Sequence, residues 1–268
     1  MSRNSAAIGL AALLLAGVVG AAEPVLLQYK FQKGEPLRYR LQMKSKSTFS
    51  MPDGKKESQD MASSMELTQE LIEAKADGSY RVSVSVEKAT QTVNGQEKPF
   101  PTQPGPQLMT MLPSGKVLDA QGPDPGTAGQ MQMVFPTKAV NEGEGWEQVG
   151  RLTNPLPLET VTKYTLDKAA APAPGGGTAA LVKSDMTIAS EKSPGGEQVN
   201  AGTKGTLYFD VAGGRILKSD AKAKFSFTMP VQVPGMPQAQ NVNVNLEMDI
   251  SIELVKGSAG SEKPSGGN

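Results

Sequence analysis

The sequence predicts a mainly β protein in which long, curved antiparallel strands form a half-open barrel or a clam-like pair of sheets. Three segments in which apolar and polar residues alternate carry this prediction, at 37–49, 80–87 and 242–254. Alternation with a period of two places the apolar side chains of a strand on one face. Long strands of this kind suit an antiparallel sheet with one solvated face. A conventional β-sandwich is the alternative architecture.

The three segments differ in length and agree in pattern. The apolar positions are mainly the odd ones in 37–49 and the even ones in 80–87 and 242–254. The last segment is well beyond the usual strand length of about five to six residues. Turn signals lie beside strand-like runs at four places, namely Asp53-Gly54, Asp77-Gly78, Asn94-Gly95 and Gly213-Gly214.

One segment is ambiguous between helix and strand. Residues 63–75 tolerate a helix, because a serine and a glutamate near their start have capping-box spacing. An internal similarity favours a strand, since 31–52 aligns without gaps on 209–230, and each copy is followed by a loop and a second amphipathic run. By this analogy we expect a strand at 65–72.

The N-terminal residues predict export to the periplasm or the extracellular space. Residues 1–22 combine a short positive start at Arg3, an apolar core, and small residues just before Glu23. The apolar run is shorter than the roughly 20 residues of a membrane-spanning helix, which disfavours an anchor. We expect cleavage after this signal peptide and no transmembrane span afterwards.

The rest of the chain is predicted to be one β-rich domain at 23–256, followed by a disordered tail at 257–268. The internal similarity suggests that the domain contains two similar halves, 23–168 and 178–256. A segment rich in Pro, Gly and Ala at 169–177 would connect them.

Composition excludes several kinds of chemistry. The chain has 27 basic and 27 acidic residues, so it lacks the positive surplus typical of nucleic-acid binding. It has no His and no Cys, which removes disulfides, thiol catalysis, histidine-based triads and the usual zinc ligands. We therefore expect no enzyme activity, no cofactor, no metal and no nucleic-acid partner.

Two other constellations have simpler structural explanations. The Met-x-Met pairs at 109–111 and 131–133 offer soft ligands for copper(I), yet methionine also fills gaps in aliphatic cores. Carboxylate pairs at 142/144 and 119/124 resemble the acid and base of a hydrolase, but they flank glycine-containing turns and are expected to be solvated.

The apolar faces of the strands support a binding function. We expect a non-catalytic envelope or periplasmic protein that holds an apolar ligand, such as a lipid chain, inside the curved sheet. The candidate ligand-facing residues are Leu41, Met43, Val84, Trp146 and Ile250. For Trp146, the single tryptophan, packing in the core is the favoured alternative. A structural or protein-interaction module of the envelope, with a protein partner in place of the ligand, is the alternative function.

Two segments carry a resemblance to a family. The segment 29–39 contains Lys33-Gly34 and ends at Tyr39, and the segment 136–146 ends with Gly-Glu-Gly-Trp. Both resemble an uncharacterised family of exported bacterial β-rich proteins, classed as a domain of unknown function. Its turn is Gly-Asp-x-Trp, and this chain has Glu144 in place of the aspartate. The resemblance implies an exported β-rich fold and supplies no catalytic residue.

Overall fold

The computed structural model describes residues 23–51, 53–100, 105–122, 132–152, 158–188, 199–231 and 240–255. All regular secondary structure in these ranges is β-strand. Among these residues, no helix has the length and apolarity needed to cross a membrane. The predicted signal peptide and the predicted tail lie outside the described residues.

One antiparallel sheet of 12 strands contains every strand of the described chain. The strands are β1 (Leu37–Ser50), β2 (Lys56–Ala74), β3 (Tyr80–Val93), β4 (Gln96–Lys98), β5 (Gln107–Met111), β6 (Val117–Gln121), β7 (Gly145–Leu152), β8 (Leu158–Pro172), β9 (Thr178–Ile188), β10 (Val199–Asp210), β11 (Arg215–Val231) and β12 (Gln240–Leu254). Their order across the sheet is β6-β5-β3-β2-β1-β12-β11-β10-β9-β8-β7, and β4 pairs with β3.

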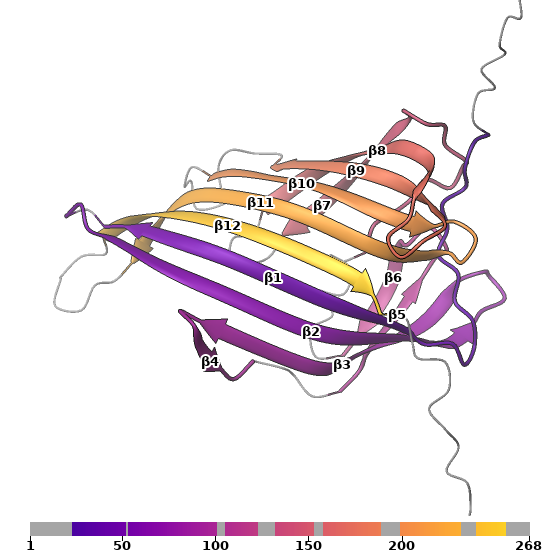
Figure 1. Ribbon diagram of the computed structural model, residues 1–268, viewed down its shortest axis with the longest axis horizontal. Helices are drawn as coiled ribbons and strands as arrows, with labels where there is room; N and C mark the ends of the chain where they lie inside the picture. The colour runs from indigo at the N-terminus through magenta and orange to yellow at the C-terminus, as the bar shows by residue number, and fades with distance from the viewer. Residues whose placement is uncertain are drawn as a thin grey trace, which may run out of the picture.

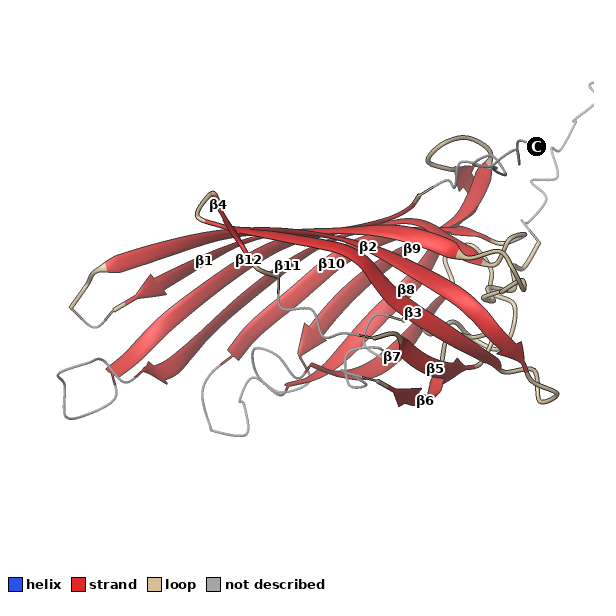
Figure 2. Ribbon diagram, turned by 90° about the horizontal axis from the view of Figure 1, so that it is seen from below, coloured by secondary structure: helices blue, strands red, loops and turns tan. Residues whose placement is uncertain are grey.

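The sheet is strongly curved and does not close into a barrel. Figure 2 shows the long strands as an arch, with the short strands β5, β6 and β7 beneath it. Within the described residues β6 pairs only with β5 and β7 only with β8, so these two strands form the free edges. The predicted half-open barrel is confirmed, and a single continuous sheet replaces the two sheets of the sandwich alternative.

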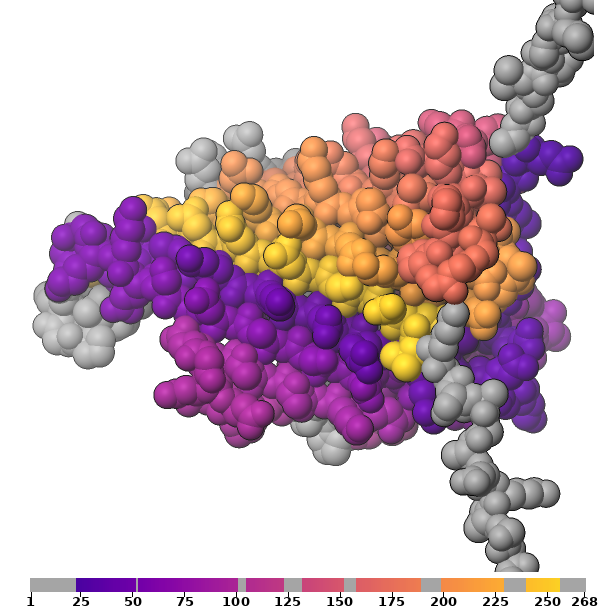
Figure 3. All heavy atoms as spheres, in the orientation of Figure 1, coloured from indigo at the N-terminus to yellow at the C-terminus, as the bar shows by residue number. Residues whose placement is uncertain are grey.

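The first and the last strand of the chain are neighbours in the middle of the sheet (Figures 1 and 3). Their register pairs Leu41 with Ile252 and Met43 with Ile250. Apolar side chains of both strands therefore share one face, as the predicted alternation requires. We call this face, which carries the buried clusters described below, the inner face; the opposite, charged face is the outer face.

The first buried cluster explains why the sheet curves. We call it the Phe209 cluster; its members are Leu27, Tyr29, Val82, Met109, Met111, Phe135, Val140, Tyr164, Leu166, Ala180, Val182, Leu207 and Phe209. They come from β3 and β5 near one edge, from β8 to β10 near the other, and from the segments before β1 and β7. The Phe135 and Phe209 rings lie 4.7 Å apart, and Val25 and Val140 exchange backbone hydrogen bonds. Burying this apolar surface brings the two halves of the sheet together.

A second cluster lies on β8, β10, β11 and β12. We call it the Phe227 cluster; its members are Leu158, Val199, Ala201, Ala223, Phe225, Phe227, Val242 and Val244. The half-buried Phe49, Met186 and Met248 pack against it. The register places these residues on the same face as the Phe209 cluster.

The local predictions are mostly confirmed. Residues 65–72 lie within β2, so the repeat-based choice of a strand was correct. Asn94 and Gly95 connect β3 to β4 with φ of 50° and 77°, as expected of a tight Asn-Gly hairpin turn. Residues 169–172 belong to β8, and the Ala173 N–H donates to the Gly177 carbonyl at 3.0 Å. The predicted connecting segment is thus a hairpin between neighbouring strands.

A β-bulge interrupts the predicted alternation in β3. The pairing of β2 with β3 shifts between Glu66 and Leu67, where Glu87 is the extra residue. Val86 immediately precedes the extra residue and is 46% exposed. The sequence pattern predicted a continuous apolar face there.

Candidate functional site

The best candidate site is a row of inner-face residues that crosses the sheet between the two clusters. We call it the central row; the register aligns Gln91, Ser63, Met43, Ile250, Ala221, Gly205 and Ser184. One neighbouring row contains Leu207 and Val182 of the Phe209 cluster, and the other contains Ala223 of the Phe227 cluster. All members of the central row except Ser63 are only half-buried. A half-buried row thus lies between two buried clusters.

The central row is apolar at its middle and small at one end. Met43 and Ile250 face each other across β1 and β12, and Ala221, Gly205 and Ser184 follow on β11, β10 and β9. An added Cβ on Gly205 would lie 2.8 Å from the Ser184 hydroxyl oxygen, so the backbone approaches closely there.

The predicted ligand-facing residues fall into two groups. Leu41, Met43 and Ile250 lie together, since Met43 pairs with Ile250 and Leu41 follows on the same face of β1. Leu41 is buried, whereas the other two are half-buried. Val84 packs against the Phe209 cluster, away from the central row. Trp146 also packs against this cluster, and the register places it in line with the central row, beyond Ser184 and Tyr164.

Trp146 is held by contacts within the chain. Its ring stacks on Tyr164 with centroids 5.4 Å apart and an interplanar angle of 22°. The indole Nε1 donates to the Val134 carbonyl at 3.0 Å, which satisfies its one polar atom. Burial raises the pKa of the Tyr164 hydroxyl. These contacts fit the packing alternative for this tryptophan.

The methionine pairs of the sequence have packing roles in the described residues. Met109 and Met111 are buried in the Phe209 cluster, and Met133 is half-buried against it. Met131 lies outside the described residues. No group of three or more Asp, Glu, His or Cys residues suited to a metal ion occurs in the described part of the chain.

The carboxylates of the predicted pairs accept hydrogen bonds from nearby parts of the chain. Glu142 accepts a hydrogen bond from the Ala169 N–H at 2.7 Å. Glu144 accepts one from the Asn141 N–H at 3.0 Å, and this bond is the main cause that lowers the pKa of the Glu144 carboxyl. Asp119 accepts a hydrogen bond from the side-chain amide of Gln121 at 2.9 Å. The other member of this predicted pair, residue 124, lies outside the described residues.

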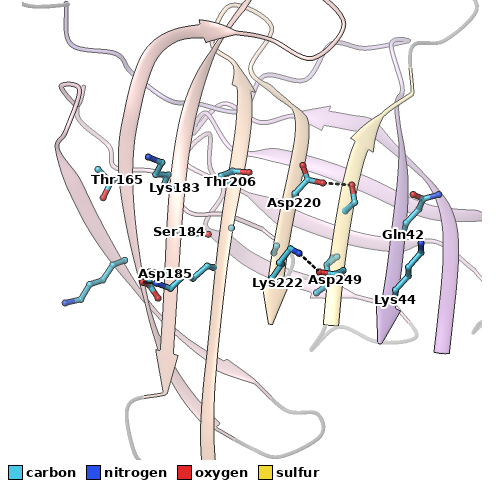
Figure 4. Close-up of a pocket in the computed structure, with 16 residues that line it drawn as sticks. Gln42, Lys44, Thr165, Lys183, Ser184, Asp185, Thr206, Asp220, Lys222 and Asp249 are labelled. Carbon is cyan, nitrogen blue, oxygen red and sulfur yellow. Dashed lines mark hydrogen bonds and ion pairs between the residues drawn. The ribbon is translucent and has the colours of Figure 1, made fainter. Parts of the chain in front are cut away.

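A groove with a volume of about 840 Å³ lies on the outer face (Figure 4). Two parallel rows of polar side chains border it: Gln42, Ser251, Asp220, Thr206, Lys183 and Thr165 in one, and Lys44, Asp249, Lys222, Lys204, Asp185 and Lys163 in the other. Residues of the central row, including Ile250, alternate with these rows and complete the lining.

Several charges along this groove pair across neighbouring strands, and Lys183 and Lys163 pair with Asp167 and Glu147 outside it. Lys222 lies 3.5 Å from Asp249 and Lys204 lies 3.4 Å from Asp185, while the Ser251 hydroxyl donates to Asp220 at 2.8 Å. Cross-strand pairs of opposite charge stabilise the register of a sheet. The groove is therefore best explained as a solvated part of the outer face, bordered by two rows of polar side chains.

The sequence predicted Met43 and Ile250 of the central row and missed its other members, of which Ser63 is the most informative. Ser63 is buried at 7% exposure, and its hydroxyl oxygen has no hydrogen-bond partner among the described residues. The sequence contains a signal for it, because Ser63 occupies the apolar phase of the alternation Met61, Ser63, Met65 and Leu67.

Comparison with known proteins gives a likeness of fold. No protein-family model matches the chain, and no curated protein is similar to it in sequence. A structure concerned with lipid–protein interactions in lipovitellin matches with a TM-score of 0.51 at 11% identity, covering 88% of this chain and 27% of that chain.

Two further structures align far less well. DynF from the dynemicin biosynthesis pathway of Micromonospora chersina has a TM-score of 0.20 at 11% identity, covering 90% of this chain and 92% of its own. A LolA-superfamily protein from Nitrosomonas europaea has a TM-score of 0.12 at 8% identity, covering 85% and 89%. The chain thus shares a curved β fold with about a quarter of the lipovitellin chain.

Proposed function

We propose that this protein is an exported, non-catalytic protein that binds an apolar ligand on the inner face of its curved sheet. The observation that carries the proposal is the central row, which is half-buried while the clusters on both sides are buried. A ligand that covered Met43, Ile250 and Ala221 would remove their apolar surface from water, at a gain of about 25 cal/mol per Å².

Two further observations support an apolar occupant. Met43 belongs to the central row, and Met61 and Met65 lie in the rows on either side of it. Their flexible side chains adapt to ligands of different shape. The fold likeness to lipovitellin, whose structure concerns lipid–protein interactions, supports a lipid as the ligand.

Export is supported by the signal-peptide pattern of residues 1–22. N-terminal sequencing of the protein from an envelope or periplasmic fraction would test it, with Glu23 expected as the first residue. An uncleaved N-terminus in the cytoplasm would contradict export.

The binding proposal is tested with N-phenyl-1-naphthylamine, a neutral probe whose fluorescence rises in apolar sites. We expect saturable binding to the wild type and a large loss in Ala221→Phe, which fills the inner face. Lys222→Phe is the matched control, because it places the same ring on the outer face of the same strand. Circular dichroism and the melting temperature establish that both variants fold. Absence of binding to the wild type, or equal binding to both variants, would refute the proposal.

The second candidate function is a protein-interaction module, and the free edge at β7 favours it. Val149 on this strand is 74% exposed, and within the described chain β7 pairs only with β8. Exposed strand edges are sites of β-augmentation. A photo-crosslinker at Val149 that gives one discrete adduct in cells, together with no probe binding, would favour this alternative.

A further inference from the structure

Ser63 is an unusual group at the centre of the inner face. A buried hydroxyl without a hydrogen bond costs about 1–3 kcal/mol, so such groups are rare without a function. In the register Ser63 lies between Met43 and Gln91. The Gln91 amide nitrogen donates to the Met61 sulfur at 2.8 Å and not to the Ser63 hydroxyl. A hydroxyl with free hydrogen-bonding capacity therefore faces the middle of an apolar surface.

The inner face has a second property, which concerns charge. The row of Leu41, the central row and the row of Ser45 contain no Asp, Glu, Lys or Arg from β2 to β8. The lysines nearest to them in sequence, such as Lys44 and Lys222, belong to the outer face. An ionised carboxylate or phosphate bound on the inner face would lack a counter-charge, and burying an unpaired charge is strongly unfavourable.

From these two properties we infer that the ligand is an uncharged lipid with an oxygen acceptor, such as an acyl ester, and that the Ser63 hydroxyl donates a hydrogen bond to this acceptor. The inference rests on the proposed binding function and specifies its ligand class. The acyl chain lies along the central row from Ser63 on β2 toward Gly205 on β10. Four strand spacings separate these strands, or about 19 Å, which is enough for an extended acyl chain.

Access to Ser63 depends on its methionine neighbours. Met61 and Met65 flank it on β2, and Met43 faces it on β1; all three are half-buried. A methionine side chain has three rotatable bonds and changes rotamer at little cost. Movement of these side chains exposes the hydroxyl to the ligand without a change in the sheet.

The test is displacement of N-phenyl-1-naphthylamine by three competitors of equal chain length: methyl dodecanoate, dodecanoic acid and dodecane. Each is measured with the wild type, with Ser63→Ala and with Ser64→Ala. Ser64 is the matched control, because it neighbours Ser63 and points to the outer face opposite Gln42. We expect Ser63→Ala to weaken ester binding by about three- to tenfold, the value of one hydrogen bond, and to leave dodecane unchanged. Ser64→Ala should change neither.

The dependence on pH tests the charge argument separately. The chain has no His or Cys, so no side chain with an ordinary pKa titrates between pH 6 and pH 8. Dodecanoic acid would bind in its neutral form, so its affinity should rise about tenfold per pH unit as the pH falls through this range. The affinity of the ester should stay constant.

The outcomes separate this inference from the proposed function. If neither the probe nor any competitor binds, the binding function itself is wrong. If all three competitors bind and Ser63→Ala leaves the ester affinity unchanged, the role of Ser63 is wrong and the binding function stands. A carboxylate that binds with pH-independent affinity would overturn the assignment of an uncharged ligand.

Discussion

Gly115→Ala is expected to loosen the contact that holds the N-terminal segment against the sheet. Gly115 lies in the turn between β5 and β6 with φ of 91°, a conformation that side chains disfavour. An added Cβ would collide with the Met133 carbonyl oxygen and lie 2.7 Å from Cε2 of the Tyr29 ring. Tyr29 is only 4% exposed and packs edge-on against Phe209 at 5.6 Å, so it has little room to move.

The size of the effect follows from two contributions. The left-handed backbone costs a residue with a Cβ about 1–2 kcal/mol, and overpacking of a tight site costs about 1–3 kcal/mol more. The sum is about 2–5 kcal/mol. A change of 1 kcal/mol shifts the melting temperature of a domain of this size by about 2–4 °C, so we expect a decrease of about 4–20 °C.

Gly78→Ala separates the two contributions. Gly78 has φ of 81° in the turn between β2 and β3, and nothing lies within 4 Å of its added Cβ. It should therefore lose only about 1–2 kcal/mol. Urea unfolding monitored by circular dichroism measures both variants. Equal losses in the two variants would refute the claim that the glycine at 115 is required by the packing of Tyr29 and Met133.

Three further predictions concern single side chains. Ser63→Ala should raise stability by about 1 kcal/mol, because it removes a buried hydroxyl without a partner; a lower melting temperature would contradict this. Glu247→Gln should destabilise the protein at pH 7, because a hydrogen bond from Lys224 lowers the pKa of the Glu247 carboxyl below its ordinary value of 4.5. The effect should diminish as the pH falls from about 4.5 through this lowered pKa, where the native carboxylate takes up its proton. A difference in melting temperature between variant and wild type that is constant from pH 7 to pH 3 would disprove this origin. Trp146→Phe should cost about 1–3 kcal/mol in urea unfolding, since it removes the bond to the Val134 carbonyl and part of the ring; an unchanged midpoint would contradict the packing role.

The faces of the long strands were predictable from sequence because β12 alternates without a break and β1 departs from the pattern only at Ser45 and Ser47. The odd residues of β1 and the even residues of β12 meet on the inner face, as expected. The grouping of Leu41, Met43 and Ile250 follows from this alternation. The same alternation, applied to β2 as a strand, places Ser63 among apolar neighbours.

The remaining features depend on contacts between distant parts of the chain. Val84 and Trp146 pack against the Phe209 cluster, to which the segments before β1 and β7 contribute buried side chains. Neither segment has a strand-like pattern, so the sequence gives no sign of where it packs. The exposure of Val86 depends on a bulge, whose position is set by the pairing of two strands rather than by either one.

The central position of β1 and β12 has a consequence for folding. The middle of the sheet joins the earliest strand to be synthesised with the latest of the twelve. Until β12 is available, β1 to β6 and β7 to β11 are separate half-sheets, each with an uncovered edge and an apolar face. Pairing of strands so distant in sequence is slow, and unpaired edges invite association with other chains. The interval between synthesis of β1 and arrival of β12 is therefore the period in which this protein most needs protection from aggregation.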